Sequence, residues 1–215
     1  MRATHGVDAP HKSSMRRNPC ALFAQQKQSN SLANHAIFPH NLVQIGMQFH
    51  RHSKSTNMIR VGMGFDVHQL VEGRDLWLGG IKIPHSMGLQ GHSDADVLTH
   101  AISDALLGAA NLRDIGYHFP DTSDKTLNMD SKIILKGVVK LLAEKGYHIG
   151  NIDATLCAER PKINPHVPAM RACLAQVMGI DEDQISIKAT TSERMGFVGR
   201  REGIAAYAVA LIVPR

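Results

Sequence analysis

The sequence is poor in cysteine and lacks long apolar runs, and each shortage excludes a class of protein. It has three cysteines among 215 residues, at spacings that form neither a disulfide framework nor a cysteine-based zinc cluster. Two of them stand in apolar surroundings, as buried thiols of a reducing compartment do. No apolar run approaches the roughly 20 residues that a membrane-spanning helix needs, so we expect no membrane association.

The sequence motifs of serine-nucleophile hydrolases and of P-loop nucleoside triphosphatases are missing as well. The chain contains no nucleophile elbow with a Ser/His/Asp set and no Walker loop. Its formal net charge of +5 comes from residues 1–57, which carry seven Lys or Arg and one acid, whereas the remainder carries 17 basic and 18 acidic residues. A nearly neutral remainder does not support nucleic-acid binding.

Residues 1–57 show no helical or strand periodicity and are rich in Ser, Asn, Gln and His. Such a segment buries too little apolar surface to offset its ordering entropy, so we expect a disordered basic extension whose histidines are no evidence for a metal. It lacks the apolar region of a secretory signal and loosely resembles an organelle transit peptide, which predicts a plastid-type organelle. We favour the alternative that Met58 is the true start, which predicts the bacterial cytoplasm.

From Ile59 onward the pattern is regular and predicts one α+β domain over residues 58–215. Apolar alternation predicts strands at 60–65, 149–159, 185–190 and 205–213, and a hairpin over 75–83 that turns at Gly79-Gly80. Helices are predicted from a cap at Ser93 or Asp94 to Gly108, over 131–145 after the cap Asp130, and from Pro165 to Met178, with a long polar loop over 111–124. We expect a mixed β-sheet with helices packed on one face. Small residues in the last strand predict that its other face packs against another surface, such as a neighbouring subunit.

A candidate metal site begins at Asp66 and His68, at the predicted end of the first strand. Side chains alternate along a strand, so these two point the same way. His100, on the predicted helix, is the best third ligand, and three protein ligands with an open position are the catalytic arrangement of zinc. Asp96, one turn from His100, is better placed as a helix-end residue or an outer partner than as a ligand. Without His100, the same Asp-x-His pair is more typical of a strand-end Asp that caps a turn, with a half-buried His beside it.

Two further groups of residues are candidates for holding phosphate. His92 and Ser93 precede a predicted helix, whose free N–H groups favour an anion, although His92 is also a plain capping residue. Thr190, Thr191, Ser192 and Glu193 follow a strand, where hydroxyls hold phosphate oxygens and a carboxylate holds Mg²⁺, or where they form an ordinary turn. Arg200 and Arg201 follow a glycine-rich loop, where they either bind an anion through bidentate hydrogen bonds or are only solvated surface charges.

Together these motifs resemble the 2-C-methyl-D-erythritol 2,4-cyclodiphosphate synthases of the non-mevalonate isoprenoid pathway. The resemblance covers essentially all of residues 58–215 and none of residues 1–57. The blocks that carry it are Gly64–His68, His92–Val97 with His100, Asp104–Ala109, Asp114–Gly116, Phe119–Thr122, Lys188–Thr191 with Glu193, Gly196-Phe197 and Gly199-Arg200.

The resemblance implies roles for the metal and catalytic residues. Asp66, His68 and His100 match zinc ligands, and Glu193 matches the carboxylate that holds Mg²⁺ or Mn²⁺ between the substrate phosphates. His92 and Thr191 match positions that stabilise the transition state. Phe197 and Arg200 match residues that line the central channel of a homotrimer, where an isoprenoid diphosphate is a candidate ligand. Arg201 stands where some relatives have glycine, and it receives no role.

The resemblance also implies a substrate pocket shared across a subunit boundary. Its methylerythritol phosphate part matches Asp114, Ile115, Gly116, Phe119, Pro120, Asp121, Thr122 and Ser123, with Asp66, His68, His92 and Ser93 beside them. Its cytidine and phosphate part matches Ala158, Glu159, Arg160, Pro161, Lys162, Ile163, Asn164, Thr190, Thr191, Ser192 and Glu193. Individual side-chain roles within residues 159–164 stay open. The implied fold is a chorismate-mutase-like or ferredoxin-like single domain that assembles as a homotrimer.

The implied reaction is closure of a cyclic diphosphate. The 2-phosphate of 4-diphosphocytidyl-2-C-methyl-D-erythritol 2-phosphate attacks the β-phosphate and expels CMP, so no protein nucleophile is needed. One alternative is a zinc-dependent phosphodiesterase that admits water instead. Another is a non-catalytic trimeric binder of isoprenoid diphosphates, which does not need Asp66, His68 and His100 together.

Overall fold

The structure is a computed structural model that describes residues 58–120 and 129–215. The interpretation of residues 1–57 and the predicted substrate contacts of Asp121, Thr122 and Ser123 therefore lie outside the described residues. Cys157 and Cys173 are free thiols, and both are half-buried, whereas the sequence predicts that two of the three cysteines are buried. Within the described part of the chain, no helix combines the length and the apolarity that crossing a membrane requires.

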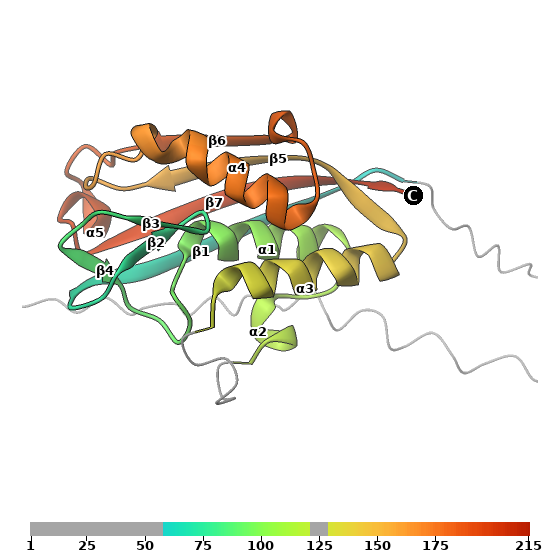
Figure 1. The fold of residues 1–215 in the computed structure, drawn as a ribbon, viewed down its shortest axis with the longest axis horizontal. Helices are drawn as coiled ribbons and strands as arrows, with labels where there is room; N and C mark the ends of the chain where they lie inside the picture. Colours follow the sequence, from blue (N-terminus) through green and yellow to red (C-terminus); the bar gives the residue numbers. More distant parts are fainter. Residues whose placement is uncertain (1–57, 121–128) are drawn as a thin grey trace, which may run out of the picture. The chain divides into compact units, whose positions relative to one another are not determined.

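The described residues form a mixed sheet with helices, which confirms the predicted α+β class (Figure 1). The strands are β1 (Arg60–Glu72), β2 (Leu76–Leu78), β3 (Ile81–Ile83), β4 (Met87–Leu89), β5 (Tyr147–Cys157), β6 (Ile185–Thr190) and β7 (Gly203–Pro214). The helices are α1 (Val97–Ala109), α2 (Ile115–His118), α3 (Ser131–Glu144), α4 (Val167–Met178) and α5 (Gly196–Gly199), with 3₁₀ turns η3 (Asn164–His166) and η4 (Glu182–Gln184).

Five strands form one sheet in the order β4-β1-β7-β5-β6, and β2 pairs with β3 as a separate hairpin. Only β5 and β6 are parallel, and the other pairs are antiparallel. Partners across the sheet connect Gly64, Ala208, Ala154 and Ile187 in one row, and all four are buried. Helices α1, α3 and α4 cover this side of the sheet, as predicted (Figure 1).

Helix α1 lies directly on β1 because two glycines leave room for its backbone. A Cβ atom at Gly64 would lie 1.9 Å from the carbonyl oxygen of Ala101, and one at Gly62 would lie 2.1 Å from that of Ala105. Both distances are far below any real Cβ contact, so no other residue type fits without moving the helix. This contact sets the distance between α1 and the side chains that β1 carries on the same face.

The first strand is longer than predicted. It continues to Glu72, so Asp66 and His68 lie within the strand and not at its end. The extension has partners on both sides, since β7 pairs as far as Gln69 and the short strand β4 pairs with Leu70 to Glu72. Neither β4 nor α2 was predicted, because each is short and is held by contacts from distant parts of the chain.

The cap of α1 is Asp96, so the predicted caps Ser93 and Asp94 are wrong. The Asp96 carboxylate accepts hydrogen bonds from the backbone N–H groups of Leu98 and Thr99 at 3.1 and 3.0 Å. The helix also continues through Gly108 to Ala109. The predicted cap Asp130 of α3 is confirmed, as is Gly146 just past the end of that helix, where φ is +85°. The other predicted boundaries are right to within about two residues.

Asp96 also ties the β2–β3 hairpin to α1. Its two carboxylate oxygens accept the N–H groups of Gly79 and Gly80 at 2.9 and 2.6 Å, and the hydroxyl of Thr99 donates to it at 2.8 Å. The side chain is fully buried. A buried carboxylate with five donors is stable only when all of them stay in place.

We predict that Asp96→Ala lowers the free energy of unfolding by about 3–5 kcal/mol, since it leaves several buried N–H groups without an acceptor. Asp130→Ala, which removes a half-buried cap, should lower it by about 1 kcal/mol. Urea unfolding of both variants measures the difference. Equal losses would show that the hairpin contacts of Asp96 add nothing to its role as a cap.

Candidate metal centre

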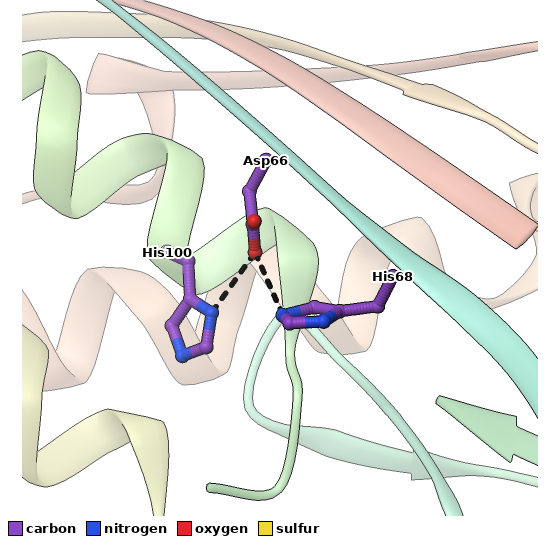
Figure 2. A group of neighbouring side chains, drawn as sticks. All are labelled: Asp66, His68 and His100. Atoms are coloured by element: carbon purple, nitrogen blue, oxygen red, sulfur yellow. Dashed lines mark hydrogen bonds and ion pairs between the residues drawn. The ribbon is translucent and has the colours of Figure 1, made fainter. Parts of the chain in front are cut away.

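Asp66, His68 and His100 meet in one group, as the sequence predicts (Figure 2). Asp66 and His68 project from β1 toward the face covered by α1, and His100 projects from the first turn of α1. Asp66 Oδ2 lies 2.9 Å from His100 Nδ1 and 3.1 Å from His68 Nε2. One ligand atom from each residue lies within 4.8 Å of the others.

The charge on this group is set by the two imidazoles. Burial alone would raise the pKa of Asp66, but the hydrogen bond from His100, the close approach of His68 and the positive charges of both imidazoles hold that pKa well below its usual range. Burial alone would lower the pKa of His100, but its hydrogen bond to Asp66 and the charges of Asp66, Asp96 and Asp94 raise it. Asp66 is therefore ionised at neutral pH, as a cation ligand must be.

The residues fit a divalent cation. The nitrogen His68 Nε2 is buried and has no hydrogen-bond partner of acceptable geometry among the described residues, although it lies near Asp66 Oδ2. A buried nitrogen without a partner is costly unless another group binds its lone pair. One carboxylate oxygen and two imidazole nitrogens form a donor set that suits zinc.

A cavity of about 290 Å³ opens in front of the group. Eight of its nine lining residues are predicted site residues, and only Ile134 of α3 is not. The lining residues are Asp66, His68, His92, Ser93, His100, Ile115, Gly116, Phe119 and Ile134. The segment 111–118, which contains α2, is tied to α1 by the carboxylate of Asp104, which accepts the N–H of Ile115 at 2.8 Å.

The phosphate-binding explanation for His92 and Ser93 is wrong in one respect. The helix begins only at Val97, and the Asp96 carboxylate occupies its first free N–H groups. The two residues do line the cavity, but they do so from the preceding loop. Asp114, another predicted substrate-binding residue, caps α2 by accepting the N–H of Tyr117 at 2.9 Å. Pro120 is the last described residue before residue 129.

A second pocket, of about 410 Å³, gathers most of the predicted cytidine-side residues. It shares no lining residue with the first cavity. It is lined by Ala158, Glu159, Pro161, Lys162, Ile163, Asn164, Pro165, Ala189, Thr190 and Thr191. The predicted residues Arg160, Ser192 and Glu193 lie in the adjoining loops outside this lining.

Glu159 holds the loop that carries Glu193. Its carboxylate oxygen Oε1 accepts the N–H groups of Ser192 and Arg194 at 3.1 and 3.0 Å, and these hydrogen bonds hold the pKa of Glu159 below its usual value. Glu193 and Arg194 both have positive φ, of 53° and 65°, which non-glycine residues seldom adopt without such support. The Thr191 hydroxyl donates to the Glu193 carboxylate at 2.5 Å.

Phe197 and Arg200 lie apart from both pockets. Phe197 is 40% exposed, and the guanidinium of Arg200 donates to both carboxylate oxygens of Glu202 at 2.8 and 2.9 Å. Arg201 has a φ of +61°, in the left-handed region that favours glycine. No role in either pocket follows for these three residues.

Sequence reasoning missed Ser131, Asp94 and Asp104. Ser131 Oγ lies 2.8 Å from His100 Nε2 and donates to the Asp94 carboxylate. In the sequence, Ser131 reads only as the start of a helix and Asp94 only as a cap. Their contact joins positions 37 residues apart, and no local pattern reports such a pair.

Three comparisons relate the chain to known proteins. The YgbB family model matches residues 59–213. The 2-C-methyl-D-erythritol 2,4-cyclodiphosphate synthase of Bacteroides fragilis is 70% identical over 154 residues, which are 72% of this chain and 97% of that protein. The IspF of Plasmodium falciparum, solved as a CDP complex, is 36% identical with a TM-score of 0.66, over 75% of this chain and 99% of that one. The bifunctional IspDF from Campylobacter jejuni is 42% identical with a TM-score of 0.71, over 74% of this chain and 43% of that one.

We predict that the metal-free protein loses stability as the pH rises through the raised pKa of His100. A raised folded-state pKa stabilises the fold fully below the ordinary histidine value of about 6.5 and ceases to do so above the raised value. The lowered pKa of Asp66 acts in the opposite direction, so its stabilisation is present above about 3.9 and is lost only in acid.

Urea unfolding in the presence of a chelator, from about pH 6 to about pH 9, tests this prediction. Asp66→Asn should flatten the alkaline decline, because it removes the hydrogen-bonded carboxylate that raises the pKa of His100. The control Asp153→Asn, which removes an ion pair on the other side of the sheet, should retain it. If the stability of Asp66→Asn declined with pH as steeply as that of the wild type, the alkaline decline would not come from the contact of Asp66 with His100.

Proposed function

The chain belongs to the YgbB family, and we propose that it is a cyclodiphosphate synthase of the non-mevalonate isoprenoid pathway. It converts 4-diphosphocytidyl-2-C-methyl-D-erythritol 2-phosphate to 2-C-methyl-D-erythritol 2,4-cyclodiphosphate and CMP. The observation that carries this function is the Asp66, His68 and His100 group at a cavity, in a chain 70% identical to a synthase of that name. The bacterial sources of such relatives favour a bacterial cytoplasmic location.

We propose zinc, one ion per chain, as the cation of this group. Asp66 Oδ2, His68 Nε2 and His100 Nδ1 are the atoms that face one another and would hold it. When bound, the ion supplies a Lewis acid that neutralises charge on a phosphate oxygen of the substrate. The protein residues supply the negative charge and the lone pairs that keep it in place.

The remaining cavity residues orient the methylerythritol phosphate. His92 and Ser93 reach the cavity from the loop before α1, and Ile115, Gly116 and Phe119 also line it. We propose that His92 stabilises the transition state, since its imidazole offers a donor to a phosphate oxygen. Asp104 positions Ile115 by accepting its backbone N–H.

The second pocket is the proposed site for the cytidine diphosphate end of the substrate. The P. falciparum relative was solved as a CDP complex, which supports a cytidine nucleotide as ligand. Glu193, held by Thr191, would bind Mg²⁺ or Mn²⁺ between the two phosphates. Thr191 adds a hydroxyl beside the same phosphates.

A homotrimer would join the two pockets. Within one chain they share no lining residue, and the sheet face opposite the helices is exposed although it is apolar. Its side chains are 40–65% exposed: Val61, Met63, Phe65, Val67, Tyr207 and Val209. We propose that two further copies cover this face and that the cavity of one chain meets the second pocket of a neighbour. We propose that Phe197 and Arg200 line a central channel that binds an isoprenoid diphosphate. The Arg200 guanidinium is also hydrogen-bonded to Glu202.

The reaction then depends on holding the substrate ends together. The substrate's own 2-phosphate attacks the β-phosphorus, the bond to the cytidine phosphate breaks, and CMP leaves. Correct positioning of two reacting groups is worth roughly 7–11 kcal/mol in favourable cases, so no protein nucleophile is required. Hydroxyl and imidazole groups that donate to the phosphates, and carboxylates that would hold cations beside them, provide that positioning.

We predict that His68→Ala abolishes zinc binding and lowers cyclisation by more than about a thousandfold, since it removes one of three ligands. The control His148→Ala, outside the cavity, should retain both. Metal content by mass spectrometry and product identity by phosphorus NMR are the measurements. Undiminished turnover in metal-free protein would rule out the metal centre, and a linear product would identify a phosphodiesterase.

We predict that Met63→Glu dissociates the trimer and abolishes turnover without unfolding the monomer, because it places a charge in the covered face. Ile133→Glu, which changes an apolar side chain of similar exposure on α3, should remain trimeric and active. Light scattering after size exclusion gives the mass of each variant. A wild-type monomer, or a trimeric Met63→Glu variant, would contradict the proposed interface.

A further inference from the structure

We propose that Ser131 and Asp94 form a hydrogen-bond relay that fixes the tautomer of His100 and thereby sets the cation affinity of the site. Both are positioning residues, since neither would touch the cation or the substrate. The inference rests on the proposed cation site of Asp66, His68 and His100. It adds an outer set of residues that belongs to neither pocket.

The relay runs from His100 away from the cavity. His100 is buried, with Nδ1 facing Asp66 Oδ2 and Nε2 lying 2.8 Å from Ser131 Oγ. Ser131, the first residue of α3, is 1% exposed, and its hydroxyl donates to Asp94 Oδ1. The backbone N–H of Ser131 donates to the other oxygen, Asp94 Oδ2, at 3.0 Å. Asp94 therefore binds Ser131 through both of its oxygens.

The chemistry of these groups fixes the direction of each hydrogen bond. An ionised carboxylate only accepts, so the single hydroxyl hydrogen of Ser131 points to Asp94. The lone pairs of Ser131 Oγ then face His100 Nε2, which must carry a hydrogen to use them. A neutral imidazole with hydrogen on Nε2 has its lone pair on Nδ1, which is the nitrogen that faces Asp66 and the cavity.

Ser93 is the alternative partner of His100, but it is the weaker one. Its Oγ lies 3.3 Å from His100 Nε2, against 2.8 Å for Ser131, and it already accepts the N–H of Ala95 at 3.2 Å. Hydrogen bonds that orient a ligating histidine typically change metal affinity by about 10–100-fold. We assign this role to Ser131 because its distance and its burial are both the more favourable.

Two substitutions test the relay, one at each of its members. Ser131→Ala removes the acceptor and should weaken zinc binding by about 10–100-fold. Asp94→Asn keeps the size of the side chain but replaces one acceptor oxygen by a donor. The remaining oxygen of the asparagine accepts the N–H of Ser131, and its NH₂ group then donates to Ser131 Oγ. The hydroxyl hydrogen must turn toward His100 Nε2, which drives the imidazole hydrogen to Nδ1, so we expect a loss of at least the same size.

Two controls match these changes. Ser103→Ala also removes a buried serine hydroxyl, but one on α1 that donates to the Thr99 carbonyl oxygen. Asp130→Asn changes the acidic cap beside Ser131, whose carboxylate accepts the N–H of Lys132 at 2.8 Å. No hydrogen bond joins either side chain to the His100 ring in the described structure, so both controls should bind zinc as the wild type does.

The full chain is tested with zinc alone, by competition against a chromophoric chelator, with unfolding curves for every variant. Nitrogen-15 NMR of the zinc-loaded protein should show a protected Nε2–H on His100 in the wild type and in both controls. That signal should be lost or exchange rapidly in Ser131→Ala and Asp94→Asn. A merely structural role for Ser131 would change unfolding without moving this signal.

The outcomes separate the two proposals. A wild-type chain that binds no zinc overturns the proposed cation site, and the relay with it. Tight binding by the wild type and equally tight binding by Ser131→Ala and Asp94→Asn overturns the relay alone. Weaker binding by both variants, with unchanged controls and loss of the Nε2–H signal, supports the relay.

Discussion

The contact of helix α1 with strand β1 is the constraint on which the metal centre depends. Gly62 and Gly64 let the helix backbone approach the strand so closely that any side chain there would overlap a carbonyl oxygen. Two residues further along the same face, Asp66 then lies 2.9 Å from His100. A wider spacing would separate the carboxylate from the imidazole and destroy the site without changing any of its ligands.

The start of α1 is fixed by a second buried carboxylate. Asp96 caps the helix and also binds the N–H groups of Gly79 and Gly80, so the hairpin and the helix are held at one point. Since His100 lies one turn after this cap, its place along the helix axis depends on Asp96. Asp94 and Ser131 then fix the ring, so one short acidic loop sets both the position and the orientation of a single ligand.

Sequence reasoning succeeded where the information is periodic. Alternation along β1 predicted that Asp66 and His68 share a face, and helical spacing predicted the element that carries His100. It failed where several neighbouring residues could each cap the same helix. Ser93, Asp94 and Asp96 are all good caps, and the N–H groups of the distant hairpin favour Asp96. The serine of the relay was likewise beyond reach, because its partner lies 37 residues away.

The same alternation couples the metal centre to the proposed assembly. Residues 62, 64, 66 and 68 of β1 pack on α1 or form the site, so residues 61, 63, 65 and 67 must face the opposite side, where they are exposed and apolar. A shift of one residue in the pairing of β1 with β7 would exchange the two sets and lose both surfaces at once. The ten residues of β1 paired with β7 therefore fix the ligands and the subunit face together.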